Sequence, residues 1–316
     1  MTDDAAATPR DAAGLAGDPD RCPATDDLPD DAAAPEGPVA VLGAGTMGHG
    51  IAQIMAMAGH PVRLQDVDPV ALEDAVERIR DNLDQGVELE KVSASTRDGA
   101  LSRLTTFATA GEAAEGAAVV IEAVPERLEL KREVLAEAAA HAADDALLAS
   151  NTSSLSIGDI ASGMDARDRV VGTHFFNPVH IMDLVEVVRG DDSDPRQVAR
   201  AVALAREADK TPIVVCDSPG FASSRLGVAL GLEAIRMLEE GVASARDIDR
   251  AMELGYNHPM GPLRLTDLVG LDTRLEIARY LDRELDGDRF EPPDLLVEMV
   301  EAGDLGKKTG QGFYQW

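Results

Sequence analysis

The stretch VAVLGAGTMGHG, residues Val39–Gly50, decides the fold of this 316-residue chain. A short apolar run leads into glycines spaced G-x-G-x-x-G, and apolar residues at helical spacing follow them. This order is typical of a strand, a tight turn and a helix. The first glycine permits the turn, the second lets a pyrophosphate approach the backbone, and the third lets the helix pack on the strand. Because the N–H groups and positive dipole end of such a helix face the phosphates, we expect a bound dinucleotide. The residues expected to contact it are Gly43, Gly45, Thr46, Met47 and Gly48.

A second apolar run, Pro61–Gln65, indicates the next strand, and Asp66 closes it. Asp66 stands 18 residues after Gly48, close to the usual offset of about 20. A carboxylate there accepts hydrogen bonds from an adenosine ribose diol and repels a 2′-phosphate, which favours NAD over NADP. Two other interpretations are a glycine-rich turn in another α/β protein and a membrane span over Val39–Gly59. The span is disfavoured because glycines and polar residues interrupt it and no basic cluster flanks it.

The length and composition fit a soluble protein of two ordinary domains, with 45% hydrophobic residues. The first 36 residues contain no apolar stretch of the kind found in signal peptides, so we expect a cytoplasmic location. Two cysteines, Cys22 and Cys216, lie far apart in the sequence. They give neither a disulfide framework nor a metal-ligand spacing, and no metal is expected.

The chain is strongly acidic, with a formal net charge of −29. This charge argues against nucleic acid and anionic membranes as partners. Only five lysines occur, so arginine supplies most of the positive charge. Acid-rich, lysine-poor surfaces resemble those of halophilic proteins from a salt-saturated cytoplasm, where screening removes self-repulsion. Halophily is therefore a hypothesis for this chain.

Strands and helices alternate from residue 37 to residue 216, after an acidic tail over residues 1–36 that is expected to be disordered. The alternation predicts a Rossmann-like, doubly wound, mainly parallel sheet of class α/β. The expected strands are Val39–Leu42, Val62–Asp66, Val119–Ala123, Ala146–Ala149, Val170–His174, Leu184–Val188 and Thr211–Cys216. The expected helices are Met47–Met57, Pro69–Glu88, Leu128–Ala143 and Asp194–Glu207.

Residues 217–316 show no strand pattern and predict an all-helical second domain. The helices expected there are Ser223–Leu238, Ala245–Leu254, Thr266–Leu285 and Asp294–Glu301.

Polar residues follow the ends of two expected strands in the first domain. Asn151 and Ser153 follow one strand, and His174 ends the next. Ligands of a Rossmann fold lie beyond the carboxyl ends of the strands, so all three face the expected nicotinamide position. Glu186 lies twelve residues after His174, and it can reach the imidazole if its strand returns beside the first. Ser153 could instead only cap a helix over Leu155–Ala161.

Seven stretches, in order from Val39 to Tyr314, make the chain similar to a known family. They are GAGTMGHGIAQ, VPERLELK, SNTSSLSI, HFFNPVHIMDLVEVV, DSPGF, YNHPMGPLRLTDLVGLD and GKKTGQGFY. The chain resembles the L-3-hydroxyacyl-CoA dehydrogenases, including the short-chain 3-hydroxybutyryl-CoA dehydrogenases. The resemblance implies reversible, NAD-dependent oxidation of L-3-hydroxyacyl-CoA to 3-oxoacyl-CoA, with 3-hydroxybutyryl-CoA as the expected substrate. It also implies a place in fatty-acid β-oxidation or short-chain acyl-CoA metabolism.

The resemblance assigns roles to individual residues. His174 is the expected general base for the 3-hydroxyl proton, a task that suits a histidine because its pKa lies near neutrality. Glu186 is expected to hold the imidazole in the right tautomer. Ser153 is expected to hydrogen-bond the substrate oxygen. The resemblance places Glu126, Lys131, Ser153, Asn177 and Lys308 against the cofactor, and Ser153, Asn177 and Ser224 against the substrate. Lys308 could instead only anchor the C-terminal turn.

One position departs from the family pattern. The family usually has asparagine just before Arg-Leu after P-G-F, close to the substrate carbonyl, whereas this chain has Ser224 there. Serine donates a hydrogen bond but reaches less far. This departure puts the rate and the acyl preference in doubt but leaves the reaction class unchanged.

The family forms dimers through its helical domain, so we expect a homodimer with the CoA group between the domains. Two alternatives remain open. One is a related dehydrogenase acting on a free hydroxy acid of the sugar acid or carnitine type, which would need an arginine near Ser224; Arg225 is adjacent. The other is a non-catalytic NAD-binding protein, as lens crystallins related to the family are. The pair of His174 and Glu186 argues against the second alternative.

Overall fold

The computed structural model describes residues 22–28 and 32–316. Its strands are β1 (Val39–Leu42), β2 (Val62–Gln65), β3 (Leu104–Phe107), β4 (Val119–Glu122), β5 (Leu147–Ser150), β6 (Val170–Phe175), β7 (Leu184–Arg189) and β8 (Thr211–Cys216). Helices α1–α7 of the first part are Gly48–Ala58, Pro69–Glu88, Ala94–Ser102, Ala110–Ala114, Leu128–Ala139, Ile157–Ala161 and Pro195–Glu207. Helices α8–α12 of the second part are Ser223–Glu239, Ala245–Gly255, Pro262–Val269, Leu271–Glu284 and Asp294–Ala302. Three 3₁₀ turns complete the order: η1 (Thr25–Asp27), η2 (Arg167–Arg169) and η3 (Lys307–Thr309).

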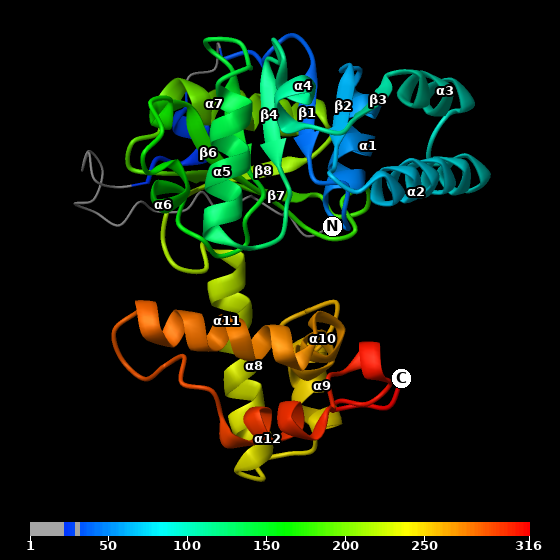
Figure 1. Cartoon of the computed structure of the whole chain (residues 1–316). Helices are drawn as coiled ribbons and strands as arrows, with labels where there is room; N and C mark the ends of the chain where they lie inside the picture. The colour runs from blue at the N-terminus through cyan, green and yellow to red at the C-terminus, as the bar shows by residue number, and fades with distance from the viewer. Residues whose placement is uncertain (1–21, 29–31) are drawn as a thin grey trace, which may run out of the picture.

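The strands form one sheet in the order β3-β2-β1-β4-β5-β6-β7-β8, with helices on both faces (Figure 1). Alternate residues of β1 enter opposite layers of the core. Val39 and Val41 pack with α1, α2 and α7, whereas Ala40 and Leu42 pack with α4, α5 and α6. The predicted doubly wound, mainly parallel fold is therefore confirmed.

The single antiparallel pairing, between β6 and β7, positions the catalytic candidates. His174 stands directly opposite Glu186 in that pairing. Strand β8 then pairs with β7 in parallel. The predicted contact between His174 and Glu186 required β7 to return beside β6, and it does so.

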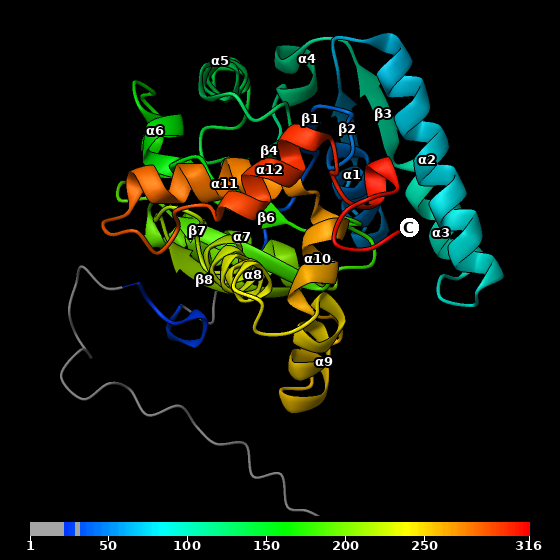
Figure 2. The same ribbon diagram turned by 90° about the horizontal axis from the view of Figure 1, so that it is seen from below.

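The second part of the chain is helical, as predicted, and lies below the sheet domain (Figures 1 and 2). Its core is formed where α8 packs against α10, α11 and α12, around Val228, Leu232, Leu263 and Leu275. The expected single helix Thr266–Leu285 is wrong, because Gly270, at φ +101°, separates α10 from α11. A side chain is strained in that conformation, so the glycine lets the chain turn between the two helices.

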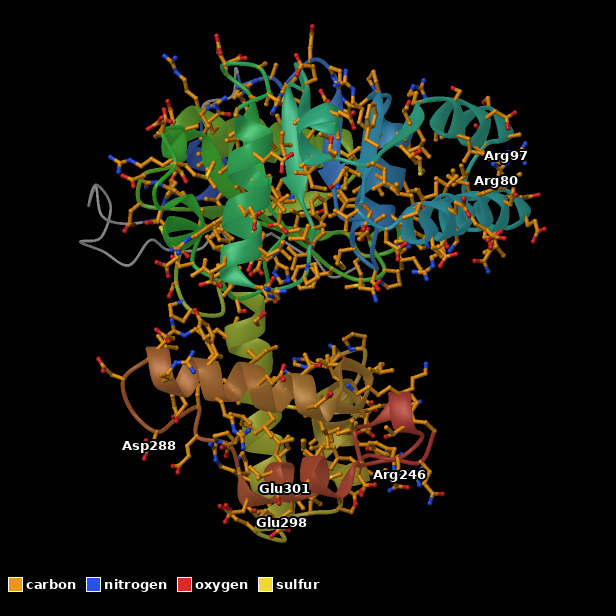
Figure 3. The ribbon with its side chains drawn as sticks, in the orientation of Figure 1. Arg80, Arg97, Arg246, Asp288, Glu298 and Glu301 are labelled. Atoms are coloured by element: carbon orange, nitrogen blue, oxygen red, sulfur yellow. The ribbon has the colours of Figure 1, made fainter. Side chains whose placement is uncertain are left out.

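Sequence analysis missed β3, α3 and α4. These elements are short and lie in a polar, alanine-rich stretch with little apolar periodicity. Helix α3 is fixed to α2 by an ion pair of 3.0 Å between Arg97 and Asp84. The two helices form an arm at one edge of the sheet, and Figure 3 labels Arg80 and Arg97 on it.

The segment 22–28 packs on the outer edge of the sheet, which corrects part of the expected disorder of residues 1–36. The Thr25 hydroxyl accepts a 2.9 Å hydrogen bond from the Val214 N–H of edge strand β8. Leu28 and Ala34 pack against the core. An edge strand leaves backbone N–H groups unpaired, and this segment supplies an acceptor. The expectation for residues 1–21 and 29–31 lies outside the described residues.

The same packing brings the two cysteines of the chain together. Cys22 and Cys216 are free thiols, and they lie close enough for each to affect the ionisation of the other. Burial, together with the Cys216 thiol, raises the pKa of Cys22 to about 12. The wide separation of these residues in the sequence gave no sign of this contact.

Residues 22–28 and 32–316 lack the features of two other classes of protein. No helix within them combines the length and apolarity needed to cross a membrane. Nor do they bring together three or more His, Cys, Asp or Glu side chains as a metal site would.

Candidate active site

The glycine-rich loop between β1 and α1 has a separate steric reason for each glycine. Gly43 has φ +100°, and a Cβ there would lie 2.8 Å from the carbonyl oxygen of Ala123. A Cβ on Gly48 would collide with the carbonyl oxygen of Gly43. A Cβ on Gly45 would meet no atom within 4 Å. The chain itself therefore requires the first and third glycines, and the second leaves open space through which a phosphate can approach the backbone.

Asp66, directly after β2, is held beside this loop by two backbone donors. Its carboxylate accepts hydrogen bonds of 2.8 Å from the Ala44 N–H and 3.0 Å from the Asp68 N–H. Each carboxylate oxygen can accept more than one hydrogen bond, so acceptor capacity remains for a ribose diol. The first contact also ties the end of β2 to the glycine loop.

The loop and Asp66 line one cavity of about 640 Å³, within the size range of cofactor sites. Of the predicted cofactor residues, the cavity brings together Gly43, Gly45, Thr46, Met47 and Asp66. Gly48 does not line the cavity, and it packs against the carbonyl group of Gly43. Apolar residues of three loops, such as Val67, Ala108 and Pro125, add to the lining, together with side chains of α5. A flat apolar group such as adenine fits this surface beside Asp66, so the residues present fit a bound dinucleotide.

A buried charge cluster joins β4, α5 and the loop after β5. The Lys131 ammonium lies 2.8 Å from a Glu122 carboxylate oxygen and 3.1 Å from one of Glu126. Lys131 and Glu122 are fully buried. Burial raises the pKa of Glu122, against the opposing charge of Lys131 and a hydrogen bond from Ser150. Sequence analysis missed Glu122, although an acid at the end of an apolar strand is a signal for a buried partner.

Glu126 links the buried charge cluster to the predicted site, because it contacts both Lys131 and the loop of Ser153. It accepts hydrogen bonds from the Thr152 hydroxyl and, at 3.0 Å, from the Ser153 N–H. Burial alone would raise the pKa of Glu126, but Lys131 and these hydrogen bonds outweigh it and lower the pKa. Glu126 therefore fixes the loop that presents Ser153.

Lys131 was expected to contact the cofactor, but its ammonium group is paired with carboxylates of the protein. The Lys131 ammonium is fully buried and is taken up by two carboxylates and the Val124 carbonyl. Its part in the described structure is to hold Glu126. The direct contact stays a prediction.

His174 and Glu186 form the centre of the site. The His174 Nδ1 lies 2.8 Å from a Glu186 carboxylate oxygen, and Glu186 is fully buried. A carboxylate at Nδ1 selects the tautomer with its proton on that nitrogen, which leaves Nε2 as the free base. The imidazole is also covered by Phe176, whose ring centroid lies 4.4 Å away.

Glu186 is anchored from the helical domain. It accepts hydrogen bonds from the backbone N–H groups of Ala222 and Ser223, at 3.1 and 2.7 Å, and from the Ser223 hydroxyl at 2.7 Å. Burial would raise its pKa, but the hydrogen bonds from His174 and Ser223 outweigh burial and lower it. Glu186 is thus ionised near neutrality. The role of Ser223 was not predicted, because no local sequence pattern indicates that the start of α8 contacts β7.

The loop after β5, which carries Ser153, is held against the end of β6, the strand of His174. Asn151 accepts a 3.0 Å hydrogen bond from the Phe175 N–H, which holds the loop against the end of β6. The capping residue of α6 is Ser156, whose hydroxyl accepts from the Asp159 N–H. Ser153 is therefore not the cap, and its hydroxyl lies at the surface of the site, 3.4 Å from Glu126.

The remaining predicted site residues, Asn177, Ser224 and Lys308, come from three different parts of the chain. Asn177 is exposed just after β6. Ser224 is half-buried in the first turn of α8, next to the Ser223 that binds Glu186. Lys308 forms an ion pair with Asp272 at the start of α11, so it has a structural partner within the helical domain. Its expected cofactor contact stays a prediction.

A nucleotide cradle beside an oriented histidine–carboxylate pair defines a nicotinamide-dependent dehydrogenase. The family models for the 3-hydroxyacyl-CoA dehydrogenase NAD binding domain and C-terminal domain match residues 38–218 and 220–316. The chain belongs to the 3-hydroxyacyl-CoA dehydrogenase family, as the resemblance predicted, and is an NAD-dependent oxidoreductase.

Individual relatives agree with this assignment. The chain is 42% identical to a probable 3-hydroxybutyryl-CoA dehydrogenase of Bacillus subtilis, over 88% of this chain and 96% of the relative. It is 44% identical to a 3-hydroxybutyryl-CoA dehydrogenase of Mycobacterium tuberculosis, over 88% and 98%. The crystal structure of (S)-3-hydroxybutyryl-CoA dehydrogenase from Ralstonia eutropha superposes with a TM-score of 0.85 at 39% identity, covering 88% of this chain and 98% of that one.

Proposed function

We propose that this dehydrogenase oxidises short-chain L-3-hydroxyacyl-CoA, with 3-hydroxybutyryl-CoA as a substrate. One observation carries the proposal: His174 is oriented at 2.8 Å by a buried, ionised Glu186 and keeps its Nε2 free beside the Ser153 loop. The names of the relatives support the short acyl chain. The pathway that this reaction serves, fatty-acid β-oxidation or short-chain acyl-CoA metabolism, is part of the proposal.

His174 removes the proton of the 3-hydroxyl group through Nε2. In the reverse direction the imidazolium returns that proton to the oxygen at C3. Glu186 keeps the proton on Nδ1 and stabilises the imidazolium that forms. Gly45 and Asp66 would hold NAD in the cavity that they line, and the bound NAD would supply the hydride acceptor for the oxidation. Because Glu186 is tied to Ser223, the base is in place when the helical domain is docked on the sheet domain.

Ser153 donates a hydrogen bond to the substrate oxygen at C3, and Ser224 lies where the acyl carbonyl is expected. Glu126 positions Ser153 and contributes to the cofactor site, with Lys131 behind it. Asn177 contacts cofactor and substrate from the end of β6. Lys308 contacts the cofactor only if its ion pair with Asp272 opens or extends.

Self-association into a homodimer through the helical domain is a further part of the proposal. Helices α8, α9 and α10 expose large apolar side chains at Leu226, Leu254, Leu265, Leu268 and Val269. Large apolar side chains left exposed in this way support burial at an association surface. The cytoplasm is the proposed location, which suits two cysteines that are free thiols.

An assay of purified protein in high salt tests the proposal. We expect NAD reduction with L-3-hydroxybutyryl-CoA and far less with free 3-hydroxybutyrate. Equal or better use of the free acid would favour the hydroxy-acid alternative. Absence of turnover with both, while NAD still binds, would favour a non-catalytic NAD-binding protein. Light scattering at the same salt concentration measures the mass, and a monomer would contradict the dimer.

A further inference from the structure

The N-terminal segment 22–28 brings a second cysteine to the outer edge of the sheet. Cys216 is the last residue of the edge strand β8. The 2.9 Å hydrogen bond from the Val214 N–H to Thr25 fixes the level of the segment on this strand. The backbone at Ala24 is extended, with φ −67° and ψ 152°, so the three residues from Thr25 back to Cys22 cover about as much length as the step from Val214 to Cys216.

Both cysteines lie on one face of the sheet. Cys216 shares the face of Val214, because residues two apart in a strand point to the same side. Val214 packs against the core layer that α7 covers, and Leu28 of the N-terminal segment packs against the same layer. Both thiols are half-buried, so a small oxidant in solution reaches them.

Arg189 places a cation beside the two thiols. It stands opposite Cys216 in the parallel pairing of β7 with β8, so the two side chains leave the sheet on the same side. Burial and the Cys216 thiol raise the pKa of Cys22, and the Arg189 guanidinium lowers it in part. A guanidinium in this place stabilises the thiolate, which is the form of cysteine that attacks a disulfide.

We propose that Cys22 and Cys216 are a redox-modifiable pair, in which a small-molecule disulfide oxidises the two thiols to a disulfide that links the N-terminal segment covalently to β8. Structural disulfides are rare in a reducing compartment, so the pair rests as two thiols and closes when oxidant accumulates. The closed form holds the segment over an edge strand, whose unpaired N–H groups otherwise invite pairing with other chains.

The oxidation proceeds by two exchanges. The Cys216 thiolate attacks one sulfur of the small disulfide, and the first small thiolate leaves. The Cys22 thiol then loses its proton, attacks the Cys216 sulfur of the mixed disulfide and expels the second small thiolate. The two leaving thiolates take up the two cysteine protons, so two electrons pass from the protein to the oxidant. Cys216 reacts first because burial keeps the Cys22 thiol protonated near neutral pH.

Oxidised glutathione, added to the reduced full-length chain, tests the pair. The thiols titrated after denaturation should fall from two per chain to none, and the mass of the chain should fall by two hydrogen atoms. Peptide mapping without reductant should find the Cys22 and Cys216 peptides linked. The Tm should rise by roughly 3–6 °C, because the new bond closes a loop of about 195 residues in the unfolded chain. Reduced glutathione in excess should reverse each change.

Cys22→Ser and Cys216→Ser are the matched variants, because serine is close to cysteine in size. Neither should gain Tm on oxidation. Cys22→Ser should stop at a mixed disulfide of Cys216 with glutathione, whereas Cys216→Ser should stay largely unmodified at pH 7. Covalent dimers, stable glutathione adducts on the wild type, or two thiols retained in excess oxidant overturn the inference. An internal disulfide without a rise in Tm overturns the link to β8. None of these readouts depends on dehydrogenase activity, so the proposed function is tested separately.

Discussion

Ser223 donates a 2.7 Å hydrogen bond to the carboxylate of Glu186, and this contact joins the helical domain to the base of the reaction. Glu186 in turn holds His174 at 2.8 Å. The orientation of the imidazole therefore depends on the start of α8, a helix of the other domain. The pairing of β6 with β7 brings the two residues together, and docking of the helical domain completes the hydrogen bonds of Glu186.

Replacing Ser223 by alanine should weaken this link in a pH-dependent way. The hydrogen bond to a buried carboxylate contributes about 1.5–3 kcal/mol. The folded-state pKa of Glu186 is lowered, so its stabilisation is present above the pKa of the unfolded chain and is lost as the pH falls through the folded-state pKa. We expect Ser223→Ala to lose that amount at pH 7 and progressively less as the pH falls below the unfolded-state pKa of Glu186 and through its lower folded-state pKa. Urea unfolding across this range measures it. A loss independent of pH would contradict the argument.

Ser223→Ala also tests whether Ser223 positions Glu186 for catalysis or only packs against it. Because Glu186 keeps its two backbone donors, NAD affinity should stay normal while kcat falls about tenfold. Ser223→Thr keeps the hydroxyl and should recover most of the rate. A variant that raises only KM would show that Ser223 acts on substrate binding instead.

His174→Gln should keep NAD affinity and lose most of the turnover. Glutamine is polar and of similar reach, but it cannot take a proton near neutral pH. General acid–base catalysis contributes about 10²–10⁴-fold, which sets the expected fall in kcat. His141→Gln is the control, because His141 lies exposed at the other side of the sheet domain. A near-normal rate in His174→Gln would remove His174 from the role of base.

Asp66→Ala should reduce the preference for NAD over NADP. The variant loses hydrogen bonds from a ribose diol to a carboxylate, worth about 1.5–3 kcal/mol, so NAD should bind roughly 10–100-fold more weakly. NADP should lose less, since the repulsion of its 2′-phosphate also disappears. Asp68→Ala is the control, because Asp68 caps α2 just outside the cavity. Fluorescence titration with both cofactors measures the ratio, and an unchanged ratio would place the ribose elsewhere.

Much of the site could be predicted from local sequence. The three glycines and Asp66 are fixed by the geometry of one turn, and the pairing of His174 with Glu186 follows once β7 returns beside β6. Contacts between distant segments could not be predicted. The hydrogen bond from Ser223 to Glu186 exists only after α8 has packed on the sheet domain. No periodicity in either segment specifies its partner.

The boundaries of helices and strands likewise divide into those that local sequence determines and those that depend on the folded chain. Helix α2 begins as predicted because Pro69 at its first position, the Asp68 cap and an amphipathic pattern coincide. The break at Gly270 was missed, since apolar residues continue on both sides of it and only the backbone angle separates α10 from α11. The segment 22–28 was expected to be disordered because its own apolar content is low, yet its acceptor meets an edge strand nearly 190 residues away.

Lys131→Met should be strongly destabilising, because it leaves Glu122 buried and unpaired. Breaking a buried ion pair costs about 3–5 kcal/mol. The pKa of Glu122 is already raised by burial and should rise further in the variant, so protonation on lowering the pH should restore part of the stability. Adding Glu122→Gln should recover most of the loss. Urea unfolding at pH 7 and pH 5 measures both effects, with exposed Lys91→Met as the control. Equal losses in the single and double variants would contradict the pairing.

The stability of the whole chain should depend strongly on salt. The net charge is −29, and acids such as Asp288, Glu298 and Glu301 project from the outer end of the helical domain (Figure 3). Self-repulsion among exposed charges is screened over about 10 Å at 0.1 M salt and about 3 Å at 1 M. Relief of about 3 kcal/mol of repulsion corresponds to a Tm rise of roughly 4–5 °C for a chain of this size, because the unfolding entropy is about 2.1 cal/mol/K per residue.

Thermal unfolding in KCl from 0.05 to 2 M measures that rise. Sucrose at matched osmolality is the control, because it is excluded from protein surfaces but carries no charge. A Tm that rises with KCl and not with sucrose supports halophily. Full stability after dialysis to low salt would show that the acidic surface of this dehydrogenase is tolerated without screening, and the halophilic interpretation would be abandoned.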